Sequence, residues 1–226
     1  MTNTSVVELD WSQQYRIVSS EFPPINFFEQ LVDPELMEDL YYIESLTNDR
    51  LRDEAGDISL VQPEDRISGP GSSPIMAAFT HASESCPSRF SSGAYGIYYA
   101  SSTLETAIAE TKYHRAKFLS YTKEDPGEID MRAYIGEVVK PMHDVRDGGY
   151  EHLHDPDDWS ESQNFGKSMR ESESWGIVYN SVRDQDGQCI AVLRPPAVSI
   201  PRQGPHLSYV WDGVTISDVY EKTLLT

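Results

Sequence analysis

A short aromatic strand that leads directly into a helix is the feature that most constrains this chain, and it lies between residues 93 and 114. The run at 97–99 consists of residue types that favour strands. Ser102 is the predicted helix N-cap, and Glu105 three residues later completes a capping-box pattern. One face of the predicted helix carries Leu104, Ala107, Ile108 and Thr111. Taken alone, this junction is compatible with an ordinary strand and helix, or with a binding site built from its tyrosines and Glu110.

The other segments predict strands and helices in a mixed order. Further strands are expected at residues 14–18, 132–139, 176–183, 189–193, 209–211 and 214–216. Turns are expected at residues 118–126, at Asp186-Gly187 and at Asp212-Gly213, the last two as hairpin turns. Further helices are expected at residues 34–52, 74–81 and 155–171.

The helix expected at 155–171 has the clearest start signal, because Asp155 is a favourable N-cap and Pro156 suits the first helical position. Its expected buried residues are Trp159, Phe165 and Met169. No internal repeat is evident, and strand hairpins with helices between them predict one α+β domain rather than repeated βαβ units.

The chain is strongly acidic, which bears on its possible partners. It has 37 acidic and 18 basic residues, for a net charge of -19. Such a surface repels phosphate backbones and anionic lipids, so direct nucleic-acid binding is disfavoured. There is no apolar run of about 18 residues and no signal-peptide pattern, so a cytoplasmic protein without a membrane span is expected. Cys86 and Cys189 are far apart and predict neither a disulfide framework nor a thiolate metal site.

Two local patterns suggest ligands only weakly. Glu151, His152, His154 and Asp155 resemble metal ligands, but they lack HExxH-like spacing and lie in a polar segment, so no metal site is predicted. The glycine-containing run at 69–74 has neither a Walker pattern nor GxGxxG before a helix, which disfavours a phosphate loop.

Carboxylates and hydroxyls give sharper candidates for catalysis. Glu105 and Glu110 are five residues apart, about 140° around a helix, so they do not form a glycosidase pair across one bond. Capping accounts for Glu105, whereas Glu110 is left without a structural explanation. Ser181 lies outside any GxSxG pattern and is expected at a strand end, where serine commonly bonds its own backbone.

Four motifs occur in an order that resembles the RES domain family, which is named for its Arg, Glu and Ser. They are Tyr15-Arg16-Ile17, Arg89-Phe90-Ser91, the run from Tyr99 to Glu110, and the run from Gly176 through Ser181 to Arg183. The tyrosine eleven residues before the glutamate makes the pattern fairly specific. The resemblance spans residues 14–195. It implies a RES-like domain at 14–226 with a long insert at about 26–85, preceded at 1–13 by a tail or edge strand.

RES proteins are toxins of bacterial toxin–antitoxin pairs, and their fold resembles the ADP-ribosyltransferases, with helices around an NAD cleft in a split mixed β core. The resemblance therefore implies an enzyme that consumes NAD+ as substrate and needs no other cofactor. The implied partner is an antitoxin with an Xre-like DNA-binding domain, and a homodimer is possible. Hydrolysis, phosphorolysis and ADP-ribosylation of a protein all stay open. So does a non-enzymatic acidic interaction module, favoured by the net charge and the polar segment at 147–164.

The resemblance also implies roles for individual residues. Glu110 would stabilise the cation that forms as nicotinamide leaves, and Ser181 would orient Glu110 or a ribose hydroxyl. Arg16 would bind the diphosphate, with Arg89 as the rival for this role, because a guanidinium offers forked donors. Tyr99 would be the first choice for a wall against the nicotinamide ring, with Tyr98 or Tyr95 as the alternatives. The remaining candidates for substrate binding are Tyr95, Tyr98 and Asn180.

Overall fold

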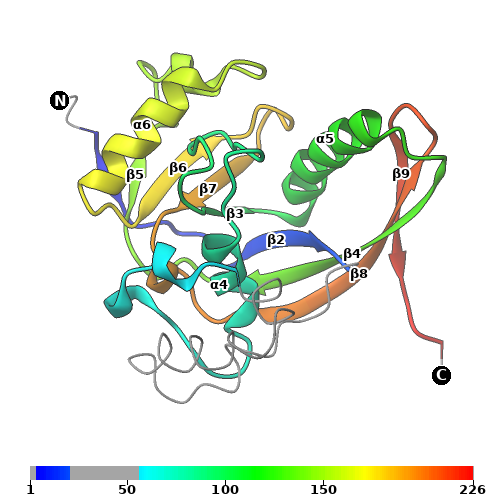
Figure 1. Ribbon diagram of the computed structural model, residues 1–226, viewed down its shortest axis with the longest axis horizontal. Coiled ribbons are helices and arrows are strands. Elements are labelled where there is room, and N and C mark those ends of the chain that lie inside the picture. Colours follow the sequence, from blue (N-terminus) through cyan, green and yellow to red (C-terminus); the bar gives the residue numbers. More distant parts are fainter. Residues whose placement is uncertain (1–3, 21–55, 226) are drawn as a thin grey trace.

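The computed structural model describes residues 4–20 and 56–225, which form one mixed sheet of nine strands flanked by helices (Figure 1). The strand order is β1-β5-β6-β7-β3-β2-β4-β8-β9. Strands β5 and β6 pair in parallel, and the other neighbours are antiparallel. This architecture confirms the predicted α+β class. The helix predicted at 34–52 lies outside the described residues.

The strands have the following bounds: β1 Val6–Val7, β2 Gln14–Ser19, β3 Tyr98–Ser101, β4 Gly127–Gly136, β5 Met142–Asp144, β6 Gly176–Asn180, β7 Gln188–Val192, β8 Arg202–Trp211 and β9 Ile216–Lys222. The α-helices in the described ranges are α4 Ser73–Thr80, α5 Leu104–Thr122 and α6 Ser160–Glu171. Short 3₁₀ helices lie at η2 Ile58–Leu60, η3 Pro63–Asp65, η4 Glu151–His154 and η5 Pro195–Ala197. None of these helices is long and apolar enough to cross a membrane.

Three clusters of buried apolar residues pack the helices onto the sheet. Helix α4 packs Met76 and Phe79 against the β3 residue Tyr98. Helix α6 places Phe165 over the cluster that contains Ile177 of β6. Helix α5 covers the half of the sheet around β4 and β8. Successive residues of β3 point to opposite faces of the sheet, so the two tyrosines of this strand belong to different clusters.

The start of α5 differs from the predicted capping box. The N-cap is Thr103, whose Oγ1 accepts the Thr106 backbone N–H at 3.1 Å, so the prediction of Ser102 as cap was wrong. Glu105 is exposed in the first turn, where a carboxylate favours the positive end of the helix dipole. The helix continues to Thr122, into the turn that was predicted at 118–126. Adjacent hydroxyl residues give the sequence no means of choosing between the two caps.

The start of α6 also differs from the prediction. Asp155 does not cap this helix, since its Oδ1 accepts the backbone N–H groups of Asp157 and Asp158 in a local turn. The helix begins at Ser160. The three residues predicted to be buried, Trp159, Phe165 and Met169, are half-buried. The fully buried positions are Ser162 and Gly166, and a Cβ at Gly166 would lie 2.1 Å from the Phe90 carbonyl oxygen.

The two predicted hairpins are present, and both have longer turns than predicted. Strands β8 and β9 are joined by residues 212–215, which include the predicted Asp212-Gly213, and this glycine has a φ of 97°. Strand β9 begins at Ile216, so the strand predicted at 214–216 started two residues too early. Strands β6 and β7 pair as predicted, but their connection runs from residue 181 to 187 rather than through a two-residue turn at Asp186-Gly187. The backbone N–H of Gly187 instead donates to the Asp184 carbonyl. This longer loop carries Ser181.

We expect Thr103→Ala to destabilise the fold by about 1 kcal/mol, because it leaves a first-turn N–H without its side-chain acceptor. The matched control is Ser102→Ala, which removes a neighbouring hydroxyl that does not cap the helix. Chemical denaturation followed by circular dichroism measures both changes. An equal loss of stability in the two variants would contradict the cap assignment.

Candidate functional site

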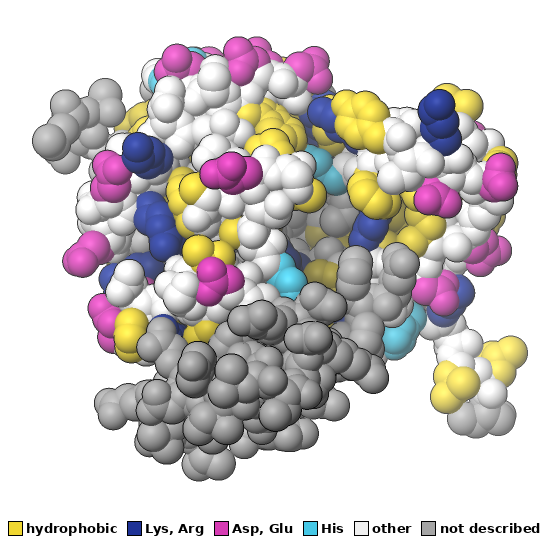
Figure 2. Space-filling view, in the orientation of Figure 1, with side chains coloured by type: hydrophobic (Ala, Val, Ile, Leu, Met, Phe, Trp, Pro, Cys, Tyr) yellow, Lys and Arg dark blue, Asp and Glu magenta, His cyan; other side chains and the backbone are white. Residues whose placement is uncertain are grey.

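A cavity of about 290 Å³ lies between β2, β3, β7 and α5. Figure 2 shows a recess beside α5 in the same region. Four of the predicted site residues line the cavity: Arg16 from β2, Arg89, Tyr99 from β3, and Glu110 from α5. These residues are up to 94 positions apart in the chain, from 16 to 110, and the order β7-β3-β2 in the sheet brings their strands together.

Glu110 is held by a short hydrogen bond from the β6–β7 loop. Ser181 Oγ donates to Glu110 Oε1 at 2.6 Å. The same Oγ accepts the backbone N–H groups of Arg183, at 3.1 Å, and Asp184, at 3.0 Å. A hydroxyl has one proton and two lone pairs, so these contacts use the whole group and direct its proton to the carboxylate. The thiol of Cys189 lies 3.9 Å from the same carboxylate oxygen.

The loop that carries Ser181 is fastened to the first turn of α5. Thr106 Oγ1 donates to Asp184 Oδ2 at 2.6 Å. Gly187 allows this close approach, since a Cβ there would lie 2.6 Å from the Thr106 methyl group. The backbone N–H of Ser181 also donates to the Gly187 carbonyl, which closes the loop. The loop that carries Ser181 is therefore held against α5, the helix that carries Glu110, and this fixes the position of Ser181 relative to Glu110.

Arg16 is a half-buried cation with an enclosed, unused donor. Its Nη1 donates to the Tyr99 carbonyl at 3.0 Å, and its Cζ lies 4.6 Å from the centre of the Tyr98 ring. Its Nε is enclosed and has no hydrogen-bond partner in the part of the chain that the structure describes. Among residues 4–20 and 56–225, no carboxylate forms an ion pair with it. Burial lowers the pKa of Arg16, and an anion in the cavity would supply the missing compensation.

Arg89 is buried and, unlike the Nε of Arg16, its Nη1 donors have backbone partners. Its Nη1 donates to the carbonyl oxygens of Leu153, at 3.0 Å, and Asp155, at 2.8 Å. These bonds attach Arg89 to η4 and to the residue that follows it. The carbonyl groups accept hydrogen bonds but leave the positive charge in place, so Arg89 also contributes a cation to the cavity wall.

The two tyrosines of β3 have different surroundings. Tyr99 lines the cavity, donates to Ser88 Oγ at 2.9 Å and accepts the Phe90 N–H at 3.0 Å. Burial raises the pKa of Tyr99 to about 12. Tyr98 lies on the other face of the strand, fully buried, and its hydroxyl accepts from Gln14 Nε2 at 2.9 Å. Strand alternation thus gives the wall position to Tyr99 and not to Tyr98.

The predicted residues Tyr95 and Asn180 are also outside the cavity lining. Tyr95 donates to the Phe90 carbonyl at 2.6 Å. The backbone N–H of Asn180 lies 3.2 Å from His154 Nε2, and its side-chain Nδ2 donates to the Arg146 carbonyl at 2.8 Å. These contacts brace the framework next to the site.

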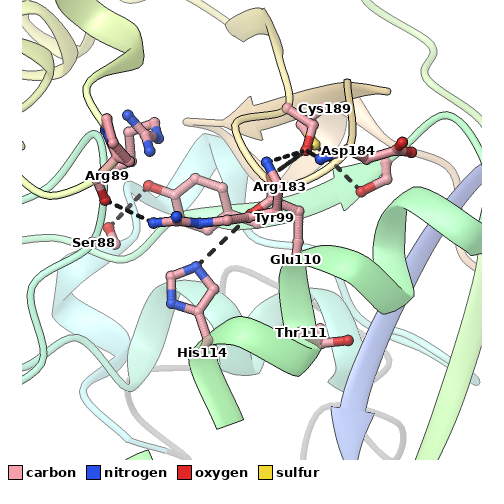
Figure 3. A network of polar contacts seen from close by, with 12 residues as sticks. Ser88, Arg89, Tyr99, Glu110, Thr111, His114, Arg183, Asp184 and Cys189 are labelled. Atoms are coloured by element: carbon pink, nitrogen blue, oxygen red, sulfur yellow. Dashed lines mark hydrogen bonds and ion pairs between the residues drawn. The ribbon is translucent and has the colours of Figure 1, made fainter. Parts of the chain in front are cut away.

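Several lining residues were not among the sequence candidates: His114, Trp159, Tyr179, Arg183 and Cys189. Helical spacing could have identified His114, because it follows Glu110 by four residues and so lies on the same face of α5. Arg183 belongs to the motif that contains Ser181. Trp159 and Cys189 gave no such signal. Figure 3 shows Glu110 and His114 projecting from α5 toward Tyr99 and Cys189.

His114 stands next to the carboxylate without neutralising it. Its Nε2 lies 4.0 Å from Glu110 Oε2. The His114 side chain is 53% exposed, but its ring is partly desolvated against the cavity wall. This desolvation, followed by the positive charges of Arg183, Arg89 and Lys117, lowers the pKa of His114 to about 4. The imidazole is therefore neutral at pH 7, and Glu110 is not paired with a cation on this side.

The charge of the cavity is opposite to that of the whole chain. Three arginines line it, Arg16, Arg89 and Arg183, against the single carboxylate of Glu110 among the described lining residues. The chain as a whole carries a net charge of -19. A positive pocket in an acidic protein favours an anionic ligand over a cationic one. Within the described ranges, no group of three His, Cys, Asp or Glu side chains could hold a metal ion.

Comparisons with known proteins find a family match, a sequence relative and a solved structure. The family model described as "RES domain" matches residues 63–212, a range that includes Tyr99, Glu110 and Ser181 but not Arg16. The uncharacterized protein y4oC of Sinorhizobium fredii (strain NBRC 101917 / NGR234) is 32% identical over 216 residues, which is 91% of this chain and 86% of that protein. Among solved structures, a chain of the M. tuberculosis MbcT-MbcA toxin-antitoxin complex is 15% identical. It covers 56% of this chain and 72% of its own length, with a TM-score of 0.40.

We expect His114 to remain neutral down to about pH 5, because its pKa is lowered to about 4 from the ordinary 6.5. The unfolded chain would bind this proton at higher pH than the folded chain, so the stability that His114 contributes is lost as the pH falls from 6.5 toward 4. NMR titration of the imidazole signals, with His114→Gln to assign the resonance, measures the pKa. A midpoint near 6.5 would contradict the expectation.

Proposed function

The chain belongs to the RES domain family, and we propose that it cleaves the nicotinamide–ribose bond of NAD+ and acts as the toxin of a bacterial toxin–antitoxin pair. The observation that carries the proposal is that one cavity holds both Glu110, oriented by Ser181, and Arg16, a cation that no carboxylate of the described residues compensates. Glu110 is suited to stabilise a reacting ribose, and Arg16 is suited to bind the diphosphate of the same NAD+ molecule.

The chemistry needs a fixed negative charge beside the ribose. As the bond from the ribose carbon to the nicotinamide nitrogen breaks, its electron pair goes to nicotinamide, which leaves as a neutral molecule. Positive charge then develops on the ribose ring, and Glu110 stabilises it. The oxygen of water or phosphate bonds to the same carbon, and the proton of an attacking water passes to Glu110 or to solvent. The neutral state of His114 supports this proposal, because it leaves the charge of Glu110 available.

Ser181 serves this reaction as a positioning residue. Because two backbone N–H groups already occupy its oxygen, Ser181 is poorly placed to act as a nucleophile itself. Its hydrogen bond removes the rotational freedom of the Glu110 carboxylate before substrate arrives, so less reorganisation is needed during the reaction.

The remaining cavity residues fit the other parts of a dinucleotide. Arg16 contacts the diphosphate through its free Nε, whereas Arg89 fixes the cavity wall with its donors and adds positive charge. The half-buried ring of Tyr99, held by Ser88 and Phe90, forms the flat wall for nicotinamide. No cofactor other than the substrate is required.

We propose the biological setting that the resemblance implies. Because NAD+ is a cytoplasmic metabolite, the protein acts in the cytoplasm, and depletion of NAD+ arrests growth. An antitoxin that carries an Xre-like DNA-binding domain neutralises the toxin. The acidic surface makes direct DNA binding by the toxin itself unfavourable, so contact with DNA is left to the antitoxin.

We expect Glu110→Gln to reduce NAD+ consumption by about 10²–10³-fold, since the variant keeps the shape of the side chain but loses its charge. The matched control is Glu105→Gln, which makes the same change at an exposed position of the same helix. NAD+ is measured enzymatically after addition of purified protein. Consumption by Glu110→Gln at the wild-type rate would refute the role of Glu110.

Further assays identify the molecule that accepts the ADP-ribose group: water, inorganic phosphate or a protein. Product analysis with and without inorganic phosphate separates phosphorolysis from hydrolysis. Transfer to protein would instead give labelled protein when the adenosine half of NAD+ carries the label, with little loss of bulk NAD+. If the wild-type protein neither consumes NAD+ nor labels protein, the enzymatic proposal fails and the acidic interaction module is favoured.

A further inference from the structure

His154, in the segment whose side chains resembled metal ligands, contacts the backbone through both of its ring nitrogens. It is the last residue of η4 and is half-buried. Its Nδ1 lies 2.9 Å from the Tyr150 carbonyl oxygen, and its Nε2 lies 3.2 Å from the backbone nitrogen of Asn180 in β6. Both nitrogens therefore have partners, and neither is left to bind a metal ion.

These two contacts fix the tautomer of the imidazole. A carbonyl oxygen accepts hydrogen bonds and cannot donate, so Nδ1 carries the proton. A backbone N–H donates and cannot accept, so Nε2 keeps its lone pair. An imidazolium would carry a proton on both nitrogens, and its Nε2–H would face the Asn180 N–H, which is also a donor. The contact between η4 and β6 therefore requires a neutral ring with the proton on Nδ1.

The ring supplies an acceptor at the place where strand β5 has ended. Strand β5 ends at Asp144, and the next residue, Val145, donates its N–H to the Val178 carbonyl of β6. Asn180 is two residues further along β6, so its N–H points to the same side of the strand as the backbone groups of Val178. There it meets His154 Nε2 instead of a strand. A partly buried N–H without an acceptor costs stability, so His154 supports the last residue of β6.

Asn180 immediately precedes Ser181, the residue that orients Glu110. A rigid, planar peptide unit joins Asn180 to Ser181, so a shift of one moves the other. Ser181 Oγ donates to Glu110 Oε1 at 2.6 Å. A displacement of about 1 Å would lengthen this bond beyond hydrogen-bonding range. His154 thus secures the strand side of the Ser181 contact, as Asp184 secures its loop side.

The same segment holds Arg89 at the cavity wall. Leu153 and Asp155, the two neighbours of His154 in the chain, accept hydrogen bonds from Arg89 Nη1 through their backbone carbonyls, at 3.0 Å and 2.8 Å. The imidazole attaches this three-residue stretch to β6. The anchors of Arg89 and the end of β6 therefore keep their relative position through the side chain of His154.

We propose that His154, in its neutral form with the proton on Nδ1, is a positioning residue that holds Ser181 and Arg89 in place around the cavity. His154 does not line the cavity itself, so it acts through these two residues. Its effect on catalysis rests on the NAD+ cleavage proposed above, whereas the hydrogen bonds and the tautomer that carry the proposal do not.

The surroundings of His154 favour the neutral ring. Burial lowers the pKa of His154, and this effect outweighs the hydrogen bond to the Tyr150 carbonyl, which raises it. The positive charge of Arg89 lowers the pKa further. Other titratable groups around the ring are Glu151 and His152 of η4 and Tyr179 of β6, whose ring centre lies 6.4 Å from that of His154. Because the unfolded chain has the higher pKa, the stability from the neutral ring is present above about pH 6.5 and is lost as the pH falls through the lowered pKa.

NMR of the imidazole nitrogens tests the structural part of the proposal without any substrate. The nitrogen chemical shifts of His154, assigned by comparing the wild type with His154→Gln, should show a protonated Nδ1 and an unprotonated Nε2 at neutral pH. On acidification, the amide signals of Asn180 and Ser181 should move with the same midpoint as the imidazole. An Nε2–H tautomer, or amide signals that do not follow the imidazole, would overturn the proposal.

Kinetics test the functional part. His154→Leu removes the acceptor and should lower kcat for NAD+ consumption about 10²-fold, because Ser181 then no longer holds the Glu110 carboxylate in position. The matched control is His152→Leu, which makes the same change at an exposed residue of the same 3₁₀ helix. His154→Gln keeps an oxygen that accepts the Asn180 N–H but cannot be protonated. It should retain most of the wild-type rate at neutral pH and lose activity at a lower pH than the wild type does.

Circular dichroism establishes that each variant is folded before its kinetics are compared. A folded His154→Leu variant as active as His152→Leu, or the same loss of activity with falling pH in the wild type and His154→Gln, would overturn the proposal. If His154→Leu does not fold, the pH profile of His154→Gln and the amide titration decide. If the wild-type protein consumes no NAD+, the proposed function fails, whereas the tautomer and the amide titration still test the position of His154.

Discussion

The hydroxyl group of Ser181 is the point on which the geometry of the cavity depends. Its oxygen accepts two backbone N–H groups of its own loop, and its one proton goes to Glu110. The loop is in turn bound to α5 through Thr106 and Asp184. A helix and a hairpin loop are thus joined by two hydrogen bonds of 2.6 Å, and the carboxylate is held at the side of the cavity without any contribution from a ligand.

Local sequence patterns predicted the elements better than their ends. The hairpins β6–β7 and β8–β9 and the helix after β3 follow from alternation, turn residues and helical spacing. The caps did not follow, because Ser102 and Thr103 offer the same chemistry and only the backbone conformation at Thr103 decides between them. Asp155 illustrates the same limit, since a side chain that can cap a helix can equally well close a turn.

The site could be predicted only in part, because its contacts join distant parts of the chain. Ser181 and Glu110 are 71 residues apart, and Arg16 and Tyr99 are 83 apart. Resemblance to a family supplied these residues and made Tyr99 the first choice for the wall, but it gave no physical reason to prefer Tyr99 over Tyr98. Strand alternation makes Tyr98 and Tyr99 mutually exclusive as wall residues, and the packing of α4 against Tyr98 settles the choice. Trp159 enters the lining through a loop that the sequence predicted as helix.

The burial of Arg16 connects stability with ligand choice. A guanidinium enclosed without a carboxylate partner in the described ranges costs stability that a neutral side chain would not. The Tyr98 ring and the Tyr99 carbonyl recover part of that cost, and both belong to β3, so the cation is held where the cavity opens. An anionic ligand that reaches Nε gains the compensation that the folded chain does not provide itself. The same feature that weakens the fold would therefore strengthen binding of the phosphate-containing substrate proposed above, and a nearby carboxylate partner for Arg16 would have removed that advantage.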